Sequence, residues 1–316
     1  MRSRSKCTVL AAVVSCFVLL FRFASFDSQS FSRVRKLQAR PVIYTFFNPL
    51  LEDAFVTEMS PAGDEALVDY WKQSWEEAGW EPRVLTLQDA RQHPEYDALA
   101  TKLDGTLLDG YNKMCIWRWV AMAQAGGGWM ADYDTFPLRD FTHLARPLPN
   151  DGELSVHDRR VPDLVSGSSA EWIRLAHAIL QSLLEKDALK RDELARLDDT
   201  SKKPRKRKQY TAWSDMMALH EWATTKPNMY KTDSMVMIRA FDQPDEALGQ
   251  PWSPTKCMER TPPDSIYAVH FAHAALKKAI ASNLLRPGQT MDDRAAIAKE
   301  WLQVWKQSCS HVKSIQ

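Results

Sequence analysis

Short apolar segments that alternate with amphipathic segments constrain the fold of this chain more than any other feature of its sequence. Residues 41–47 and 81–87 are rich in β-branched, aromatic or leucine side chains, and residues 129–131 form a third apolar run. Between these runs lie residues 64–79 and 111–124, whose apolar side chains recur at helical spacing. Strand, helix, strand, helix and strand in this order predict a parallel α/β sheet, with functional sites where its strands end.

The second half of the chain has a less regular pattern. In chain order we expect strands at residues 152–157 and 163–166, helices at 171–185 and 211–223, a strand at 234–238, and residues 266–271 leading into a helical C-terminus. We therefore expect a Rossmann-like sheet in residues 41–140 and an irregular α+β half in residues 141–316.

The N-terminus carries the pattern of a membrane anchor. Arg2, Arg4 and Lys6 precede an uncharged run at residues 7–21, and basic residues next to such a run stay on the cytoplasmic side. We expect residues 1–26 to form a cytoplasmic tip and a transmembrane signal anchor, and residues 27–40 a short stem. The body would then lie on the far side of the membrane, as in a single-pass type II protein. A cleaved signal peptide is the alternative.

Overall charge and cysteine content argue against several classes of function. The formal net charge is +1, so no electrostatic reason favours a nucleic-acid partner. The five cysteines include no C-x-x-C pair, which argues against a disulfide scaffold and against a structural zinc site. A single disulfide between Cys257 and Cys309 is compatible with a body in an oxidising compartment.

Two acidic side chains, Asp132 and Asp134, directly follow the apolar run at residues 129–131. Side chains at positions i and i+2 of an extended segment point to the same side. Oxygen ligands in that arrangement suit a hard divalent ion such as Mn²⁺ or Mg²⁺, which can bind the phosphates of a nucleotide. The triple glycine at residues 126–128 is expected to let the backbone turn tightly and approach a ligand. The alternative is that both aspartates merely end a strand.

Residues 113–138 resemble the core of the DXD-containing glycosyltransferases, a group that includes the initiation-specific mannosyltransferases and the α-1,4-galactosyltransferases. The resemblance rests on a helix that carries Arg118 and on Gly-Gly-Trp-Met-Ala-Asp-Tyr-Asp at residues 127–134, which matches the family pattern Gly-Gly-aromatic-x-x-Asp-x-Asp. It implies a GT-A fold, a UDP- or GDP-sugar donor, a Mn²⁺ or Mg²⁺ ion and, as a rule, retention of the anomeric configuration. Together with the anchor, it implies a catalytic body in the lumen of the Golgi or the endoplasmic reticulum.

The resemblance also implies roles for individual residues. Asp134 would coordinate the metal, and Asp132 would contact the ribose or sugar of the donor and the metal too. Arg118 would correspond to a helix arginine near the donor, although the family position, counted back from the glycines, holds Trp119. A surface ion pair is the alternative for Arg118. Further donor-side candidates are Phe46, for which core packing is the alternative, Asn48, Lys113, Gly127, Gly128 and Tyr133.

Candidates in the second half follow from the same resemblance. Asp215 lies near the start of an expected helix, where family members place an acceptor-side or catalytic carboxylate. Alternatively, it only complements the helix dipole. His270 and His273 lie where GT-A enzymes often supply a C-terminal histidine as a further metal ligand. At most one of the two is expected to bind the metal, and His270 is preferred over His273.

The sequence thus predicts a metal-dependent glycosyltransferase that moves a hexose from a UDP- or GDP-sugar to a glycan, lipid or protein-linked acceptor. Its expected catalytic residues are Asp132, Asp134, Asp215 and Arg118. The alternatives are a catalytically inactive glycan-binding protein on a GT-A fold and a metal-dependent hydrolase. Manganese-dependent turnover of a nucleotide sugar separates an active enzyme from the binding protein, and release of free sugar without an acceptor identifies the hydrolase.

Overall fold

The computed structural model describes residues 39–49, 58–158, 161–198, 213–232, 236–241 and 266–309. The chain divides into two units, residues 1–40 and 41–316, and nearly all described residues belong to the second. The predicted signal anchor lies outside the described residues, as does the predicted stem except for its last two residues. Within the described ranges, no helix combines the length and the apolar character needed to cross a membrane.

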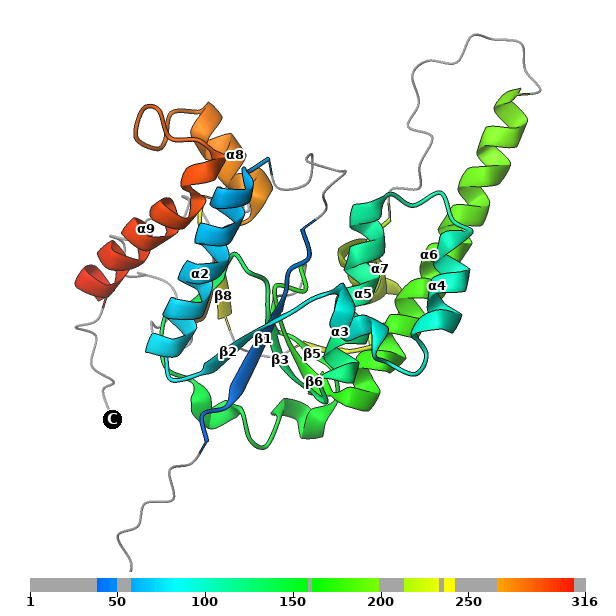
Figure 1. The fold of residues 1–316 in the computed structure, drawn as a ribbon, viewed down its shortest axis with the longest axis horizontal. Coiled ribbons are helices and arrows are strands. Elements are labelled where there is room, and N and C mark those ends of the chain that lie inside the picture. The colour runs from blue at the N-terminus through cyan, green and yellow to red at the C-terminus, as the bar shows by residue number, and fades with distance from the viewer. Residues whose placement is uncertain are drawn as a thin grey trace, which may run out of the picture. The chain divides into compact units, whose positions relative to one another are not determined.

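A six-stranded sheet forms the centre of the second unit, with the strand order β2-β1-β3-β6-β5-β7 (Figure 1). Its strands are β1 (Val42–Phe46), β2 (Glu81–Leu85), β3 (Gly127–Ala131), β5 (Ser155–Val156), β6 (Leu164–Ser168) and β7 (Lys231–Thr232). β1 pairs in parallel with β2 and β3, whereas β6 runs antiparallel to both β3 and β5. The predicted α/β class and the parallel pairing among the first three predicted strands are therefore confirmed. The second half of the chain extends the same sheet with β6, which runs antiparallel to β3, and with β5 and β7, which pair in parallel with each other.

A second sheet of three strands joins the middle of the chain to its C-terminal region. β4 (Thr135–Pro137) pairs antiparallel with β9 (Ile266–His270), and β9 pairs in parallel with β8 (Val236–Arg239). The sequence predicts no strand directly after the two aspartates. Residues 135–137 form a new strand because β9, distant in sequence, supplies a partner for them.

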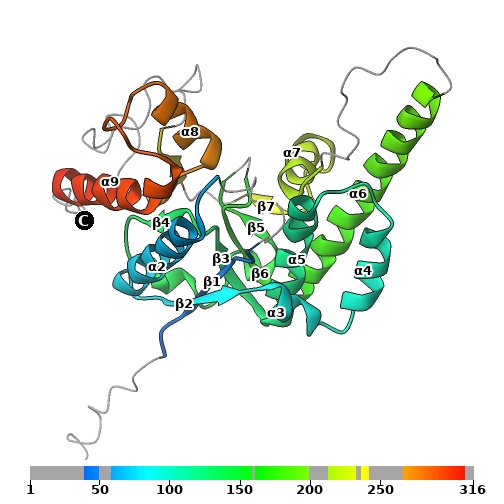
Figure 2. The same ribbon diagram turned by 45° about the horizontal axis from the view of Figure 1, so that its top comes forward.

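The α-helices lie on two sides of the central sheet (Figures 1 and 2). One layer holds α3 (Leu87–Arg91), α4 (Tyr96–Asp104), α5 (Gly110–Gln124), α6 (Ser169–Asp198) and α7 (Asp215–Thr225). The other layer holds α2 (Pro61–Glu77), α8 (His273–Ala281) and α9 (Arg294–Cys309). Short 3-10 helices occur at Thr142–Leu144, Pro149–Gly152 and Met291–Asp293.

Side-chain caps explain where the helices of the first half begin. Ser60 accepts a hydrogen bond of 3.2 Å from the backbone N–H of Gly63, so α2 begins at Pro61 and not at the predicted residue 64. Asp109 likewise accepts a hydrogen bond of 2.8 Å from the backbone N–H of Asn112. This cap fixes the start of α5, the helix that carries Arg118.

Aromatic side chains fill the space between the central sheet and α2. Trp75 and Trp80 are fully buried, and the Trp80 ring lies 5.9 Å from the rings of both Trp75 and Trp129 in edge-to-face contacts. β3 divides its side chains between two cores, as strand alternation requires. Trp129 and Ala131 face the core of α2 and α9, and Met130 faces the core of α5 and α6. The end of β3 is therefore held from both sides.

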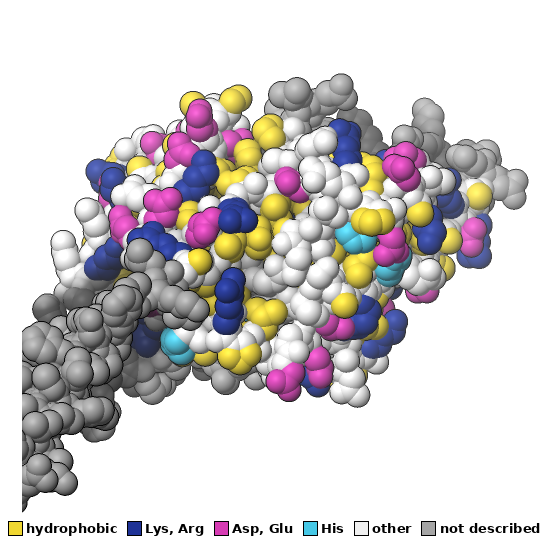
Figure 3. Space-filling model, turned by 60° about the horizontal axis from the view of Figure 1, so that its bottom comes forward, with side chains coloured by type: hydrophobic (Ala, Val, Ile, Leu, Met, Phe, Trp, Pro, Cys, Tyr) yellow, Lys and Arg dark blue, Asp and Glu magenta, His cyan; other side chains and the backbone are white. Residues whose placement is uncertain are grey.

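Charged side chains of both signs are mixed on the surface. On the face shown in Figure 3, Lys and Arg are interspersed with Asp and Glu, as the formal net charge of +1 leads one to expect. Exposed pairs such as Arg83 with Glu81, 2.6 Å apart, contribute little to stability. Five of the buried ionisable residues, in contrast, lie around the end of β3: Asp134, Asp163, Asp215, His270 and Arg294.

The triple glycine leads into β3, and packing within the protein requires its middle residue, Gly127. Gly127 has a φ of +77°, and a Cβ atom there would lie 2.4 Å from the backbone nitrogen of Ser169 and 2.7 Å from the carbonyl oxygen of Gly167. Gly126 has a φ of +95°, but a Cβ atom there would meet nothing within 4 Å. The close approach that Gly127 permits is therefore to β6 and the start of α6, and not to a ligand as the sequence predicts.

We predict that Gly127→Ala lowers the free energy of unfolding by on the order of 3 kcal/mol, because it adds a backbone clash to the strain of a positive φ. Gly126→Ala is the matched control, since it introduces strain alone and should cost about 1–2 kcal/mol. Urea titrations followed by tryptophan fluorescence measure both losses. Equal losses in the two variants would contradict the role of Gly127 in contact with β6.

Candidate metal centre

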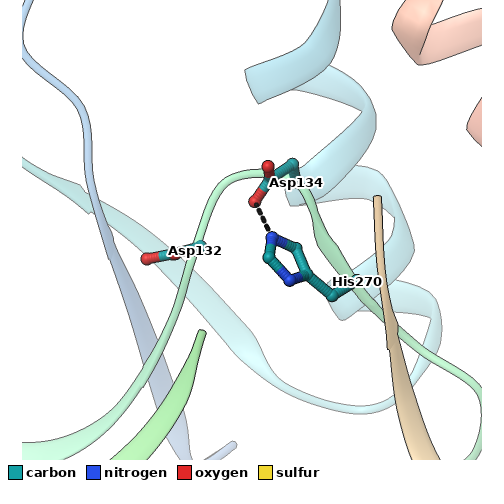
Figure 4. A group of neighbouring side chains, drawn as sticks. All are labelled: Asp132, Asp134 and His270. Carbon is teal, nitrogen blue, oxygen red and sulfur yellow. Dashed lines mark ion pairs between the residues drawn. The ribbon is translucent and has the colours of Figure 1, made fainter. Parts of the chain in front are cut away.

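Asp132 and Asp134 lie in a turn between β3 and β4. The backbone N–H of Thr135 donates a hydrogen bond of 2.9 Å to the carbonyl oxygen of Asp132. The sequence predicts that strand alternation brings the two carboxylates to one side, and this reason is wrong because the segment turns. Asp134 and His270 face one another, and Asp132 lies close to both although its side chain points away from them. One ligand atom from each of Asp132, Asp134 and His270 lies within 4.8 Å of the others (Figure 4).

His270 reaches the turn because it ends β9. Thr135 and His270 are partners in the β4–β9 pairing, and the N–H of Phe271 donates a hydrogen bond of 2.9 Å to the carbonyl oxygen of Asp134. The Nε2 atom of His270 then lies 3.4 Å from Oδ1 of Asp134. His273 faces elsewhere, with its Nε2 atom 3.9 Å from Oε2 of Glu58. The structure therefore places His270 in the acidic cluster and leaves His273 outside it.

Asp163 and Arg294 complete the surroundings of the cluster, and the sequence analysis missed both. Oδ2 of Asp163, the residue before β6, lies 2.9 Å from Nδ1 of His270. Arg294, the first residue of α9, forms a buried ion pair with Asp134 and also donates to the carbonyl oxygen of Phe271. No local motif marks either residue, because each reaches the site only through strand pairing or helix packing.

Arg118 connects the turn to α7 through a second set of contacts. Its Nη1 atom lies 2.8 Å from Oδ1 of Asp132, and its Nε atom donates a hydrogen bond of 2.6 Å to Oδ2 of Asp215. Trp119 donates a further hydrogen bond of 2.8 Å to the same Asp215 oxygen. The side chain of Arg118 is only 13% exposed, so the alternative of a surface ion pair does not hold. The structure thus brings Arg118, Asp132 and Asp215 together as one network.

Neighbouring charges set the ionisation of the cluster. Burial alone would raise the pKa of Asp134, but His270 and Arg294 outweigh it and hold that pKa at about 2. Burial would lower the pKa of His270, yet Asp134 and Asp163 raise it well above its usual value. Burial also raises the pKa of Asp132 to about 7, against the opposing effect of Arg118. At neutral pH His270 is therefore an imidazolium cation with hydrogen on both ring nitrogens. A metal ion that binds one of these nitrogens must displace its proton.

The donor set fits a divalent transition ion. The carboxylates of Asp132 and Asp134 suit Mg²⁺ or Mn²⁺, and the imidazole of His270 favours a transition ion such as Mn²⁺ over Mg²⁺. Three protein ligands leave further coordination positions of such an ion for oxygen atoms of a bound ligand. An ion bound here would be held by up to three protein ligands and would keep coordination positions for other ligands.

Three of the donor-side candidates make contacts within the protein. Phe46 packs against the hydrophobic core on the α5 side. Oδ1 of Asn48 accepts a hydrogen bond of 3.2 Å from the backbone N–H of Leu87, which links the end of β1 to the start of α3. The Nζ atom of Lys113 lies 3.7 Å from Oδ1 of Asp104 in α4. Their expected contact with a donor stays a prediction.

Tyr133 and the glycines differ in their distance from the cluster. Tyr133 lies between the two aspartates and contacts Phe47 edge-on, with 5.2 Å between the ring centres. Burial raises the pKa of the Tyr133 hydroxyl, so this group stays protonated. Gly127 and Gly128 begin β3, whereas the aspartates follow its other end, so that neither glycine lines the cluster.

Comparison with known proteins gives one family match, which lies in the first half of the chain. A family model described as a domain of unknown function, DUF8765, matches residues 29–145. The matched segment includes Arg118 and both aspartates of the turn, and it ends before Asp163 and His270. No curated protein matches the chain. The matched family has no stated function, so it assigns no chemistry to the centre.

We predict that Mn²⁺ raises the melting temperature of the full chain, by the equivalent of about 2.7 kcal/mol when its concentration is 100 times the Kd. Asp134→Asn and His270→Gln should each remove most of this rise, because each variant lacks a ligand. His273→Gln should keep it and is the matched control. Differential scanning fluorimetry with a Mn²⁺ titration measures the change. An undiminished rise in Asp134→Asn would place the bound ion elsewhere.

Proposed function

We propose that this chain is a metal-dependent glycosyltransferase that transfers a hexose from a UDP- or GDP-sugar to a hydroxyl group of a glycan, lipid or protein-linked acceptor. The closeness of Asp132, Asp134 and His270, with one ligand atom from each within 4.8 Å of the others, is the observation that carries this proposal. This cluster lies beyond the end of β3, which pairs in parallel with β1. In open α/β sheets, ligands bind outside the carboxyl ends of the strands. Carboxylates and an imidazole at this edge suit an ion that binds the diphosphate of a nucleotide sugar.

A GT-A fold is part of the proposal. Its support is the order of the elements, because a parallel β2-β1-β3 arrangement precedes the acidic turn. After the turn, strands in mixed parallel and antiparallel pairing and C-terminal helices follow, which suits a nucleotide-binding half joined to an acceptor-binding half.

We assign the metal to Asp134, His270 and Asp132, and we assign Asp132 in addition to contact with the donor. When bound, the ion neutralises negative charge on the departing diphosphate. The side chain of Asp132 is 24% exposed, compared with 11% for Asp134 and 7% for His270. Asp132 is thus the member of the cluster that a donor reaches most readily, and its carboxylate can accept a hydrogen bond from a ribose or sugar hydroxyl.

Arg118 and Asp215 keep Asp132 in place. Burial favours the protonated form of Asp132, and the guanidinium of Arg118 opposes this. The sequence predicts a catalytic carboxylate at Asp215, but this side chain is 1% exposed and accepts hydrogen bonds from Arg118, Trp119 and the backbone of Met216. Asp215 therefore cannot reach an acceptor, and we assign it to holding Arg118.

Retention of the anomeric configuration fits this arrangement better than inversion. Inversion requires a carboxylate that removes the proton of the acceptor hydroxyl from the opposite face of the sugar. Among the described residues near the cluster, Asp163 and Asp215 are too deeply buried to contact an acceptor. In a retaining reaction, a phosphate oxygen of the leaving diphosphate accepts that proton while the new glycosidic bond forms, and no dedicated base is needed.

We further propose that the catalytic body lies in the lumen of the Golgi or endoplasmic reticulum, as part of a single-pass type II protein. The support is in the sequence, where Arg2, Arg4 and Lys6 precede the uncharged run at residues 7–21. A lumenal body gives a sugar transferase access to glycan and lipid acceptors on that side of the membrane.

We predict that the full chain cleaves one nucleotide sugar from a panel of UDP- and GDP-sugars in a Mn²⁺-dependent manner. Asp132→Asn should lower kcat/KM on the order of 100-fold or more, because it removes a charged contact made at the reacting centre. His273→Gln should retain kcat/KM. The measurement is release of nucleoside diphosphate with and without Mn²⁺, in the presence of a glycan acceptor mixture.

The same experiment separates the alternatives. Transfer of the sugar to an acceptor supports the proposal. Free sugar formed at a rate that does not depend on acceptor would identify a hydrolase instead. Bound Mn²⁺ and a bound glycan without turnover of any donor would identify an inactive glycan-binding protein.

A further inference from the structure

Asp163 is a fully buried aspartate whose carboxylate lies against the imidazole of His270. Its Oδ2 atom is 2.9 Å from Nδ1, whereas the opposite ring nitrogen, Nε2, lies 3.4 Å from Oδ1 of Asp134. A neutral imidazole carries hydrogen on one nitrogen and a lone pair on the other. When an ion displaces one proton of the imidazolium, the carboxylate at Nδ1 favours the remaining hydrogen there, which leaves the lone pair of Nε2 on the side of Asp134.

We propose that Asp163 is the positioning residue of the metal centre, which orients His270 so that Nε2 binds the ion. This inference rests on the ligand set Asp132, Asp134 and His270 and does not depend on which group the protein transfers. Histidines that bind metals commonly donate their other N–H to a carboxylate, which fixes both the tautomer and the orientation of the ring.

The backbone of Asp163 holds a second member of the cluster. Ala131 and Leu164 are partners in the β3–β6 pairing, so Asp163 lies opposite Asp132. The N–H of Asp132 donates a hydrogen bond of 2.9 Å to the carbonyl oxygen of Asp163. One residue at the start of β6 thus fixes a ligand on the turn through its backbone and a ligand on β9 through its side chain.

The chemistry of the position supports a functional reason for the acid. A buried carboxylate is costly, and an apolar residue of similar volume usually packs at such a place at least as well. Asp163 lies on the far side of the ring from Asp134, so it cannot be a further ligand in the group formed by Asp132, Asp134 and His270. Orienting the His270 imidazole through Nδ1 is a role for which the negative charge of Asp163 is needed.

The test measures Mn²⁺ affinity without any sugar, by electron paramagnetic resonance of free Mn²⁺. Asp163→Leu should weaken binding 10- to 100-fold, the order of loss typical for the partner of a metal-binding histidine. Asp163→Asn should lose less, because an amide oxygen at the position of Oδ2 can accept a hydrogen bond from Nδ1–H. Asp187→Asn is the matched control, since Asp187 is also buried but contacts Leu107 and Arg191, and its Kd should equal that of wild type.

A second measurement uses the wild-type chain and so does not depend on whether a variant folds. Long-range ¹H–¹⁵N spectra of the Zn²⁺-loaded protein should show His270 protonated at Nδ1 and metal-bound at Nε2. Metal on Nδ1, or a wild-type Kd in Asp163→Leu, would overturn the inference. If the expected affinities are found but no nucleotide sugar is turned over, the role of Asp163 stands and the proposed sugar transfer does not.

Discussion

The pairing of β4 with β9 is the constraint on which the whole candidate centre depends. It sets Thr135 opposite His270 and joins the backbone of Phe271 to Asp134 at 2.9 Å. Without it, the acidic turn would carry two carboxylates that repel each other, with no imidazole to complete a ligand set. The Asp-x-Asp triplet therefore becomes a candidate metal site only after the C-terminal part of the chain has paired with the strand that follows it.

Asp134 and Asp163 are buried near one point and Asp132 is largely buried beside them, so their negative charges require positive charge nearby. Arg294 forms an ion pair with Asp134, His270 lies between Asp134 and Asp163, and Arg118 forms an ion pair with Asp132. A buried charge without a partner costs several kcal/mol, which explains why each carboxylate has a cationic neighbour before any ion arrives. A divalent ion that takes the place of the His270 proton would raise the net charge of the cluster by about one unit, and it would favour the ionised form of Asp132. The cationic side chains thus stabilise the cluster without a metal, and the carboxylates still favour a divalent ion over the single proton that it displaces from His270.

The sequence could predict the parts of this centre that are encoded locally. Apolar runs and helical spacing predict a parallel sheet that contains the first three strands, and the aspartates stand out because they follow an apolar strand. The sequence also favours His270 over His273, and the structure places His270 in the cluster. The turn at Asp132, however, depends on a strand pairing with residues far along the chain. The two carboxylates lie close together because the backbone turns, and not because side chains alternate along a strand as the sequence predicts. Asp163 and Arg294 could not be found, because an isolated aspartate and an isolated arginine carry no signal until the pairing of β3 with β6 and the packing of α9 are known.

The two aspartates belong to different layers of the protein. Asp132 is fixed through Arg118 to α5 and through Asp215 to α7, and both helices lie on one side of the central sheet. Asp134 is fixed by β9 and by the first residue of α9, which pack on the other side. The candidate centre therefore lies where two separate cores meet, and the distance between its ligands depends on how both layers pack against β3. Because packed cores move as units and do not deform freely, a ligand that contacts both aspartates would couple the two layers. Such an arrangement suits a site that must hold an ion with one layer and a second group with the other.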